Sequence, residues 1–175
     1  NPKASKARPR PRLFHMNTAI IVAAGRGTRM GPGIDKLFLE VAGLPVVAHT
    51  GRRFDRHPEI HHLCRVVRPG LEADFQELAT RLDIRKPYTL VPGGAERQDS
   101  VWNGLIRVPS STEIIAIQDG ARPCTSDVTI SRCLQSAQQT GAAVAAQRAV
   151  DTFKEADHQQ RVVRHLDRSR LWSVQ

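Results

Sequence analysis

Short apolar runs alternate with amphipathic helical stretches along most of this 175-residue chain, and this alternation restricts the possible folds more than any other feature. The runs have the length of strands, and the stretches between them repeat apolar residues at helical spacing. Such βα repetition predicts an α/β protein with a doubly wound, mostly parallel sheet and helices on both faces. Ligands of such sheets bind beyond the carboxyl ends of the strands. The predicted strands are residues 19–22, 63–67, 88–91 and 113–118, and the predicted helices are residues 72–82, 99–107 and 128–140.

Three further segments complete the expected architecture. Residues 37–47 indicate a short strand, a turn and the opening of a helix that reaches about Arg53, and residues 142–146 indicate a strand of small residues. Two alternating apolar and polar segments then flank a polar turn, which is typical of a β-hairpin. We therefore expect a β-arm at about residues 150–170 that projects from the sheet.

Composition favours one soluble globular domain. Hydrophobic residues make up 40% of the chain, and no apolar run approaches the length of a membrane span. The three cysteines, Cys64, Cys124 and Cys133, are an odd number without CxxC spacing, so we expect neither a disulfide framework nor a thiolate zinc site. The simplest setting for such a chain is the cytoplasm.

The net charge of +9 is concentrated at the start of the chain. Residues 1–15 hold five basic residues and no acidic residue, which leaves +4 for the remainder. This segment also carries three prolines and is predicted to be a disordered tail that precedes a domain of residues 16–175. The charge therefore gives no reason to expect specific nucleic-acid binding.

The first predicted strand leads directly into a glycine-bearing turn. Ala23, Ala24 and Gly25 begin it, and Arg29 and Lys36 follow within reach. Glycines allow backbone N–H groups to approach phosphate oxygens while the basic side chains neutralise charge, so a nucleoside triphosphate is the expected ligand. The spacing differs from the Walker loop and from G-x-G-x-x-G. The alternative is a tight turn between a strand and a helix, with solvated arginines.

Two other loops follow predicted strands. Gly93 and Gly94 precede a helix that contains Ser100, and their exposed backbone could read the edge of a base; ordinary helix capping by Asp99 or Ser100 is the alternative.

The second loop begins at Asp119, directly after a predicted strand. The carboxylate of Asp119 is a suitable ligand for a Mg2+ ion that is shared with substrate phosphates. Arg122 either contacts a phosphate or braces that loop. An Asx turn is the alternative for Asp119. His57, His61 and His62 lie close in sequence but lack a third acidic ligand, so a solvated turn is expected there rather than a metal site.

Taken together, these segments closely resemble the 2-C-methyl-D-erythritol 4-phosphate cytidylyltransferase family of the non-mevalonate isoprenoid pathway. The matching motifs, in the family's order, are AAGRGTRMG with DK after it, GGAERQDSV with NGL after it, DGARP, and VDTFK followed by LDRSRLW.

The resemblance implies a Rossmann-like fold of the nucleotide-diphospho-sugar transferase type and a homodimer that exchanges the β-arm. It implies cytidylyl transfer from CTP to the polyol phosphate, with release of pyrophosphate and help from Mg2+ or another divalent cation. By matching position, the implied residues are Arg29 and Lys36 as catalytic groups, Ala23, Ala24, Gly25, Gly93, Gly94, Ala95 and Ser100 for CTP, Asp119 for the metal, and Arg122, Thr152 and Arg168 for the acceptor substrate.

The sequence also departs from the family. Gln118 and Gly120 stand where the family commonly has histidine and alanine, and the sequence stops at Gln175, before the family's Thr-Pro-Gln segment and a further substrate-binding lysine. We therefore expect a chain that lacks the family's usual C-terminal end. Two alternative functions are a ribitol 5-phosphate cytidylyltransferase and a non-catalytic CTP-binding fragment.

Overall fold

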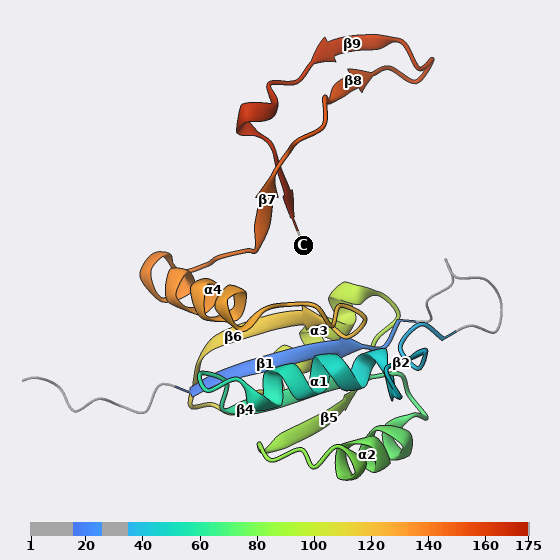
Figure 1. Cartoon of the computed structure of the whole chain (residues 1–175), viewed down its shortest axis with the longest axis vertical. Coiled ribbons are helices and arrows are strands. Elements are labelled where there is room, and N and C mark those ends of the chain that lie inside the picture. The colour runs from blue at the N-terminus through green and yellow to red at the C-terminus, as the bar shows by residue number, and fades with distance from the viewer. Residues whose placement is uncertain (1–15, 26–34, 175) are drawn as a thin grey trace, which may run out of the picture. The chain divides into compact units, whose positions relative to one another are not determined.

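The computed structural model describes residues 16–25 and 35–174, which form two compact units divided after Asp127 (Figure 1). The first contains strands β1 (Met16–Ala23), β2 (Glu40–Val41), β3 (Leu44–Pro45), β4 (His62–Val67), β5 (Tyr88–Pro92) and β6 (Thr112–Asp119), and helices α1 (Val46–Arg56), α2 (Glu72–Arg81) and α3 (Arg97–Leu105).

Four strands of the first unit form one parallel sheet in the order β5-β4-β1-β6. The register aligns Ala23 of β1 with Val67 of β4, and Val22 with Asp119 of β6. Since β1 lies between β4 and β6, the chain winds outward through β4 and β5 and then returns to the other side of β1. The predicted parallel α/β sheet is confirmed.

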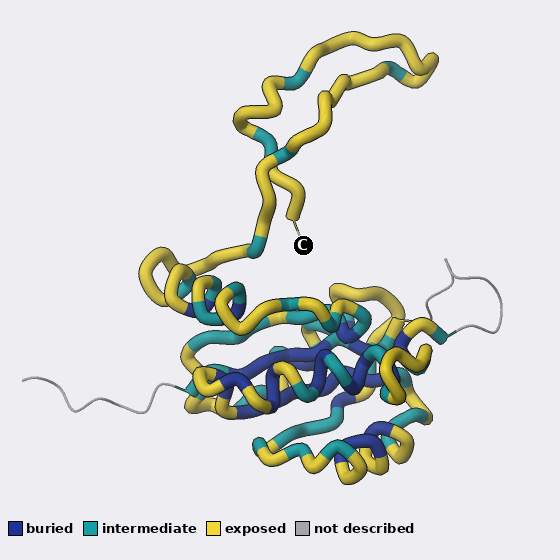
Figure 2. The backbone as a smooth tube through the Cα atoms, in the orientation of Figure 1, coloured by how far each residue is buried: buried dark blue, intermediate teal, exposed yellow. Residues whose placement is uncertain are grey.

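Helices cover both faces of this sheet because neighbouring strand residues point to opposite sides. Ala23 of β1 and Val67 of β4 pack on one face with Val47 of α1 and Phe75 of α2. Ile20, Cys64, Val66 and Val91 form the core on the other face, with Leu105 of α3 beside them. The centre of the sheet is accordingly buried (Figure 2).

Helix α3 approaches the sheet most closely at Gly104. A Cβ added there would lie 2.9 Å from Cγ2 of Ile20 and 3.0 Å from Cγ2 of Val66, closer than side chains normally pack. Glycine at this position therefore lets the helix settle directly on β1 and β4. The helix runs from Arg97 to Leu105, two residues earlier than expected at both ends.

The segment before α1 differs from the prediction of a strand that begins at residue 37. Residues 36–38 form a turn, because the Asp35 carboxylate accepts a hydrogen bond from the Leu37 N–H (3.1 Å) and the Asp35 carbonyl accepts one from Phe38 (3.0 Å). Strands β2 and β3 then pair as a small antiparallel ribbon that leads into α1.

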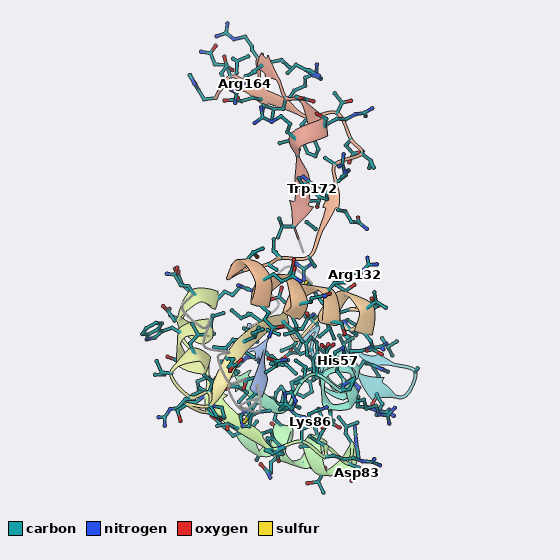
Figure 3. The ribbon with its side chains drawn as sticks, turned by 90° about the vertical axis from the view of Figure 1, so that its left-hand side faces the viewer. His57, Asp83, Lys86, Arg132, Arg164 and Trp172 are labelled. Atoms are coloured by element: carbon teal, nitrogen blue, oxygen red, sulfur yellow. The ribbon has the colours of Figure 1, made fainter. Side chains whose placement is uncertain are left out.

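The solvated turn expected near the end of α1 forms at exposed residues 58–59, and His61 is exposed, but the expectation was wrong for the other two histidines. His57 and His62 are both buried. The Nε2 atom of His57 lies 3.2 Å from the carbonyl of Asp127, and that of His62 lies 3.2 Å from the hydroxyl of Thr89. Lys86 donates to the carbonyls of Phe54, Asp55 and His57, and thus caps the C-terminal end of α1 (Figure 3).

The second unit begins with helix α4 and continues as an antiparallel arm. The arm is held by two strand pairs and by hydrogen bonds between them, from Leu166 to Phe153 (3.1 Å) and from Ala149 to Leu171 (3.0 Å). The predicted hairpin is confirmed. The elements are α4 (Asp127–Thr140), β7 (Ala146–Arg148), β8 (Lys154–Ala156), β9 (Val162–His165), the 3-10 helix η2 (Arg168–Arg170) and β10 (Trp172–Val174).

The expected strand at residues 142–146 is wrong in its bounds. Residues 142–145 have no regular structure, and the strand begins at Ala146. The segment is rich in alanine, which favours strands weakly and offers little side chain to bury. Ala146–Arg148 becomes a strand because β10 pairs with it.

The predicted division into a tail and one domain stays a prediction, since residues 1–15 lie outside the described residues. Within residues 16–25 and 35–174, no helix has the length and apolar character needed to cross a membrane.

Arg65 is a charged residue in the interior of the first unit. It lies on β4 with 4% of its surface exposed, and its Nε and Nη2 atoms have no hydrogen-bond partner among the described residues. The guanidinium lies 5.0 Å from the ring centre of Tyr88. Burial lowers the pKa of Arg65, while the charges of Tyr88 and Asp55 oppose that shift. This side chain is therefore held in the interior at a cost in stability.

We expect Arg65→Met to raise the free energy of unfolding by about 1–4 kcal/mol, the range seen when hydrophobic residues replace buried charges. Methionine follows a similar path through the core without carrying a charge. Chemical denaturation measures the change. Arg107→Met at an exposed position is the matched control, with a change within about 0.5 kcal/mol. A loss of stability in Arg65→Met would show that the buried charge is a net stabilising feature.

Candidate functional site

The loops singled out from the sequence lie at one edge of the parallel sheet. Gly93 follows β5, Arg68 follows β4, Gly25 follows β1 and Gly120 follows β6. Because the four strands are parallel and adjacent, their carboxyl ends lie along this edge in that same order. The three loops predicted from the sequence therefore begin along one edge of the sheet.

The strand order reverses direction between β1 and β6. From β1 the chain proceeds to β4 and β5 on one side, whereas β6 lies on the other. Open α/β sheets bind ligands in the crevice beyond such a switch point. The loop that follows Ala23 and the carboxylate of Asp119 flank this position.

The loop after β1 begins in the core and reaches the surface within two residues. Ala23 is buried, Ala24 is half-buried and Gly25 is exposed. Lys36 is exposed on the turn at residues 36–38. Arg29 lies outside the described residues, so its predicted role stays a prediction. The described part of the loop thus presents backbone at Gly25 and an ammonium group at Lys36.

The loop after β5 packs directly against the loop after β1. A Cβ added to Gly93 would lie 2.2 Å from the Cβ of Ala24 and 3.1 Å from the hydroxyl of Ser100. The Gly93 N–H donates to the Val67 carbonyl (2.7 Å), which ties this loop to the end of β4. The close approach of the two loops therefore requires glycine at position 93.

Ser100 holds the Gly93 loop from within. Its hydroxyl accepts a hydrogen bond from the Gly94 N–H (3.1 Å) and donates one to the Glu96 carbonyl (3.1 Å). The residue is buried. Ser100 therefore orders the loop predicted to receive the base, and its predicted direct contact with CTP stays a prediction.

The start of α3 is capped by a residue other than those considered from the sequence. Glu96 is the N-cap, and the Asp99 carboxylate accepts its backbone N–H (2.9 Å) as the second half of a capping box. Gly94 and Ala95 precede this cap and are exposed. The capping alternative and the base-binding prediction therefore coexist, because capping leaves these two residues at the surface.

Asp119 ends β6 between two guanidinium groups. Its Oδ1 accepts from Arg97 (2.9 and 3.1 Å), and its Oδ2 accepts from Arg122 Nε (3.0 Å). Burial raises the pKa of Asp119, but the hydrogen bonds and charges of Arg97 and Arg122 outweigh burial and hold that pKa below its usual value. The carboxylate is thus ionised at neutral pH. Sequence reasoning missed Arg97, although it stands in the same motif as Gly93 and Gly94.

The backbone around Asp119 is fixed by its neighbours. Gln118 donates from Nε2 to the carbonyl of Arg122 (3.0 Å) and closes the loop. Buried Gly120 donates to the Val22 carbonyl (2.8 Å) and accepts from the Thr50 hydroxyl (2.8 Å). The residues that depart from the family's usual pattern therefore hold the aspartate at the strand end.

The carboxylate oxygens of Asp119 are suitable ligands for a divalent cation that is shared with a polyphosphate. A carboxylate supplies the oxygen ligand that Mg2+ prefers, and phosphates and water complete its coordination. Oδ1 is engaged by Arg97, whose side chain is 63% exposed, so the guanidinium would have room to turn away if a cation bound the carboxylate. Asp119 is the only protein ligand that the predictions assign.

The two predicted acceptor-binding residues of the second unit lie on facing segments of the arm. Thr152 is exposed between β7 and β8. Arg168 begins η2 and donates from Nη1 to the Val150 carbonyl (2.9 Å), which brings it to the segment that carries Thr152. The arm thus groups these two residues, while Arg122 belongs to the first unit.

The parallel sheet, the glycine loops at its carboxyl edge and the ionised aspartate define the α/β fold and site type of nucleotidyltransferases. A family model described as 2-C-methyl-D-erythritol 4-phosphate cytidylyltransferase matches residues 17–175. The chain belongs to this family.

Curated relatives of that name support the assignment. The protein from Pelotomaculum thermopropionicum is 44% identical over 158 residues, which cover 90% of this chain and 66% of the relative. The protein from Geobacillus kaustophilus is 41% identical over 157 residues, which cover 90% of this chain and 68% of the relative. The chain thus spans about two thirds of the length of these relatives.

Solved structures agree with the fold. The chain is similar to 4-diphosphocytidyl-2C-methyl-D-erythritol synthase from Anaerococcus prevotii, with a TM-score of 0.81, 25% identity, and coverage of 92% of this chain and 68% of the other. A second similar structure is 2-C-methyl-D-erythritol 4-phosphate cytidylyltransferase from Thermus thermophilus, with a TM-score of 0.64, 25% identity, and coverage of 93% and 68%.

We expect Gly93→Ala to lower the free energy of unfolding by about 1–3 kcal/mol, because the added methyl group overpacks the contact with Ala24. Denaturation by urea measures the change. Gly51→Ala is the matched control, since its added methyl group meets Arg65 at an ordinary 3.7 Å and alanine favours the helix; stability is expected to stay equal or rise by up to about 1 kcal/mol. Equal stability of Gly93→Ala and the parent would contradict the close loop contact.

Proposed function

We propose that this chain provides the CTP-binding part of an enzyme that transfers a cytidylyl group from CTP to 2-C-methyl-D-erythritol 4-phosphate. The products are CDP-methylerythritol and pyrophosphate, and the reaction belongs to isoprenoid precursor biosynthesis. The observation that carries this proposal is the placement of the Gly25 loop, the Gly93 loop and Asp119 at one edge of the sheet, across its topological switch point.

The proposed chemistry follows from charge. A phosphate oxygen of the acceptor attacks the α-phosphorus of CTP in line, the new P–O bond forms, and the bond to pyrophosphate breaks. Both reactants are anions, so the site has to bring them together against repulsion. Lys36 and Arg29 are assigned to the triphosphate, and Arg122, Thr152 and Arg168 to the acceptor phosphate. Catalysis is then mostly positioning and electrostatic stabilisation.

The residues assigned to the nucleotide divide into two groups. The backbone at Ala23, Ala24 and Gly25 is assigned to the phosphates. The loop at Gly93, Gly94 and Ala95, ordered by Ser100, is assigned to cytosine and ribose. The close approach of Gly93 to Ala24 places the two groups side by side.

Asp119 is the proposed ligand for Mg2+ or another divalent cation. When bound, the cation would neutralise charge on the α-phosphate and the leaving pyrophosphate. The low pKa of Asp119 supports this assignment, since an ionised carboxylate is required. Arg122 holds Oδ2 of the same carboxylate and orients it.

We propose further that the arm joins two copies of the chain into a homodimer. Large apolar side chains are exposed on it, including Val150 (80%), Val162 (63%) and Trp172 (53%). An arm that carries both Thr152 and Arg168 can supply these residues to a site in the partner copy. The proposed interface would bury these apolar side chains, which are exposed when one copy is considered alone.

CTP with Mg2+ is expected to raise the melting temperature of this chain, because a ligand that binds only the folded state stabilises it. Lys36→Ala should weaken CTP binding about tenfold, through loss of one phosphate contact. Lys36→Arg, which keeps the charge, should lose less. Differential scanning fluorimetry over a CTP titration measures both effects. No shift with CTP would overturn the proposed function.

The choice of acceptor is measured by the release of pyrophosphate. The assay uses an enzyme that includes the family's C-terminal part. Methylerythritol phosphate is expected to support release with CTP, and Thr152→Ala and Arg168→Ala are expected to raise its KM. Turnover of ribitol 5-phosphate alone would identify the sister activity instead. CTP binding without turnover of either acceptor would identify a non-catalytic binding protein.

Sedimentation equilibrium is expected to give twice the chain mass. Val162→Glu combined with Val163→Glu should give a monomer, because charges on both sides of β9 cannot be buried in an apolar interface. Gln159→Glu in the exposed hairpin turn is the control and should leave the dimer intact. A monomeric parent chain would contradict the proposed exchange of arms.

A further inference from the structure

Arg68 occupies a central place at the carboxyl edge of the sheet. It directly follows β4, whose carboxyl end lies between those of β1 and β5. Its backbone is fixed on both sides, because the Arg68 carbonyl accepts from Leu71 (3.0 Å) and the preceding Val67 carbonyl accepts from Gly93 (2.7 Å). The side chain is 27% exposed, so most of it is withdrawn from solvent.

The guanidinium of Arg68 joins two separate parts of the predicted triphosphate site. Its Nη2 donates to the carbonyl of Gly25 (3.1 Å) and to Oδ2 of Asp35 (2.8 Å). Gly25 follows the end of β1, and Asp35 immediately precedes Lys36. One charged group therefore sets the distance between the glycine backbone and the turn that carries the lysine.

Asp35 transmits this constraint to Lys36. Its second oxygen, Oδ1, accepts the N–H of Leu37 (3.1 Å), and the Leu37 side chain is buried in the core. The turn is thus held at its start by Arg68 and at its end by the core. Lys36 lies between these two anchors and remains exposed.

The arrangement is retained despite an unfavourable feature. The Nε atom of Arg68 is buried and has no hydrogen-bond partner among the described residues. A side chain turned to solvent would satisfy that atom, and burying it unpaired costs stability. The charge-assisted hydrogen bond to Asp35 is of the strong kind and offsets the cost.

We propose that Arg68 is a positioning residue for the triphosphate: it fixes the Gly25 carbonyl and the Asp35–Lys36 turn at the spacing that the phosphates require, without contacting the nucleotide. This inference rests on the proposed function and extends it. No motif in the sequence marks Arg68, because its role arises only where β4 and β1 end side by side. A guanidinium suits the role better than an ammonium, since its planar fork keeps a fixed direction to its acceptors.

The test measures CTP and CMP affinity by isothermal titration calorimetry, with Mg2+, at a temperature where every variant is folded. Arg68→Met is expected to weaken CTP binding about tenfold and CMP binding far less, because the β- and γ-phosphates depend most on the loop spacing. Arg68→Lys should recover part of the loss and keeps the charge if the methionine variant folds poorly. Arg85→Met is the matched control, because it breaks an exposed ion pair with Asp83 in the segment before β5. The affinity for CTP and CMP should be unchanged in this variant.

A double-mutant cycle separates positioning from general stabilisation. Asp35→Asn should weaken CTP binding as Arg68→Met does, and the two together should cost little more than either alone. If the parent binds CTP and Arg68→Met binds it equally well, or loses CTP and CMP affinity equally, the role assigned to Arg68 is wrong while the proposed function stands. If the parent binds no CTP, both fall.

Discussion

The parallel pairing of β1 with β4 on one side and β6 on the other is the constraint on which the site depends. This register places the last residues of the three strands along one edge, namely Ala23, Val67 and Asp119. Backbone hydrogen bonds fix that alignment, so the loops that follow have little freedom in where they begin. Gly93, brought in by β5, then packs on Ala24 so closely that no larger residue fits. Strand register therefore sets where the loops of the site begin.

Guanidinium groups then order the edge. Arg97 and Arg122 hold the two oxygens of Asp119, and Arg68 holds Gly25 and Asp35. In each case a planar donor fork meets a carboxylate or a carbonyl at hydrogen-bonding distance. The hydrogen bonds from Arg97 and Arg122 hold the pKa of Asp119 below its usual value, and Lys36 remains exposed. Positive charge thus orders the loops of the site, and the proposed function assigns the exposed Lys36 to the triphosphate.

Much of the first unit was predictable because local patterns agree with the tertiary fold. Apolar runs in β4 and β6 and the helical spacing in α2 gave the correct element types and approximate bounds. The failures fall where long-range contacts decide. The strand expected at residues 142–146 starts at Ala146, the residue that pairs with Val174 of β10. Two of the histidines expected in solvent, His57 and His62, are buried because the packing around the end of α1 encloses them.

The sequence by itself determined the α/β class and the succession of loops after strands, and it indicated the family because four motifs of glycines and charged residues stand in the family's order. Tertiary structure alone decided which residues support them. Arg97 reaches Asp119 across 22 positions of sequence, and Arg68 reaches Gly25 across 43. Local pattern carries no record of such contacts, since they exist only once parallel strands bring distant carboxyl ends to the same edge.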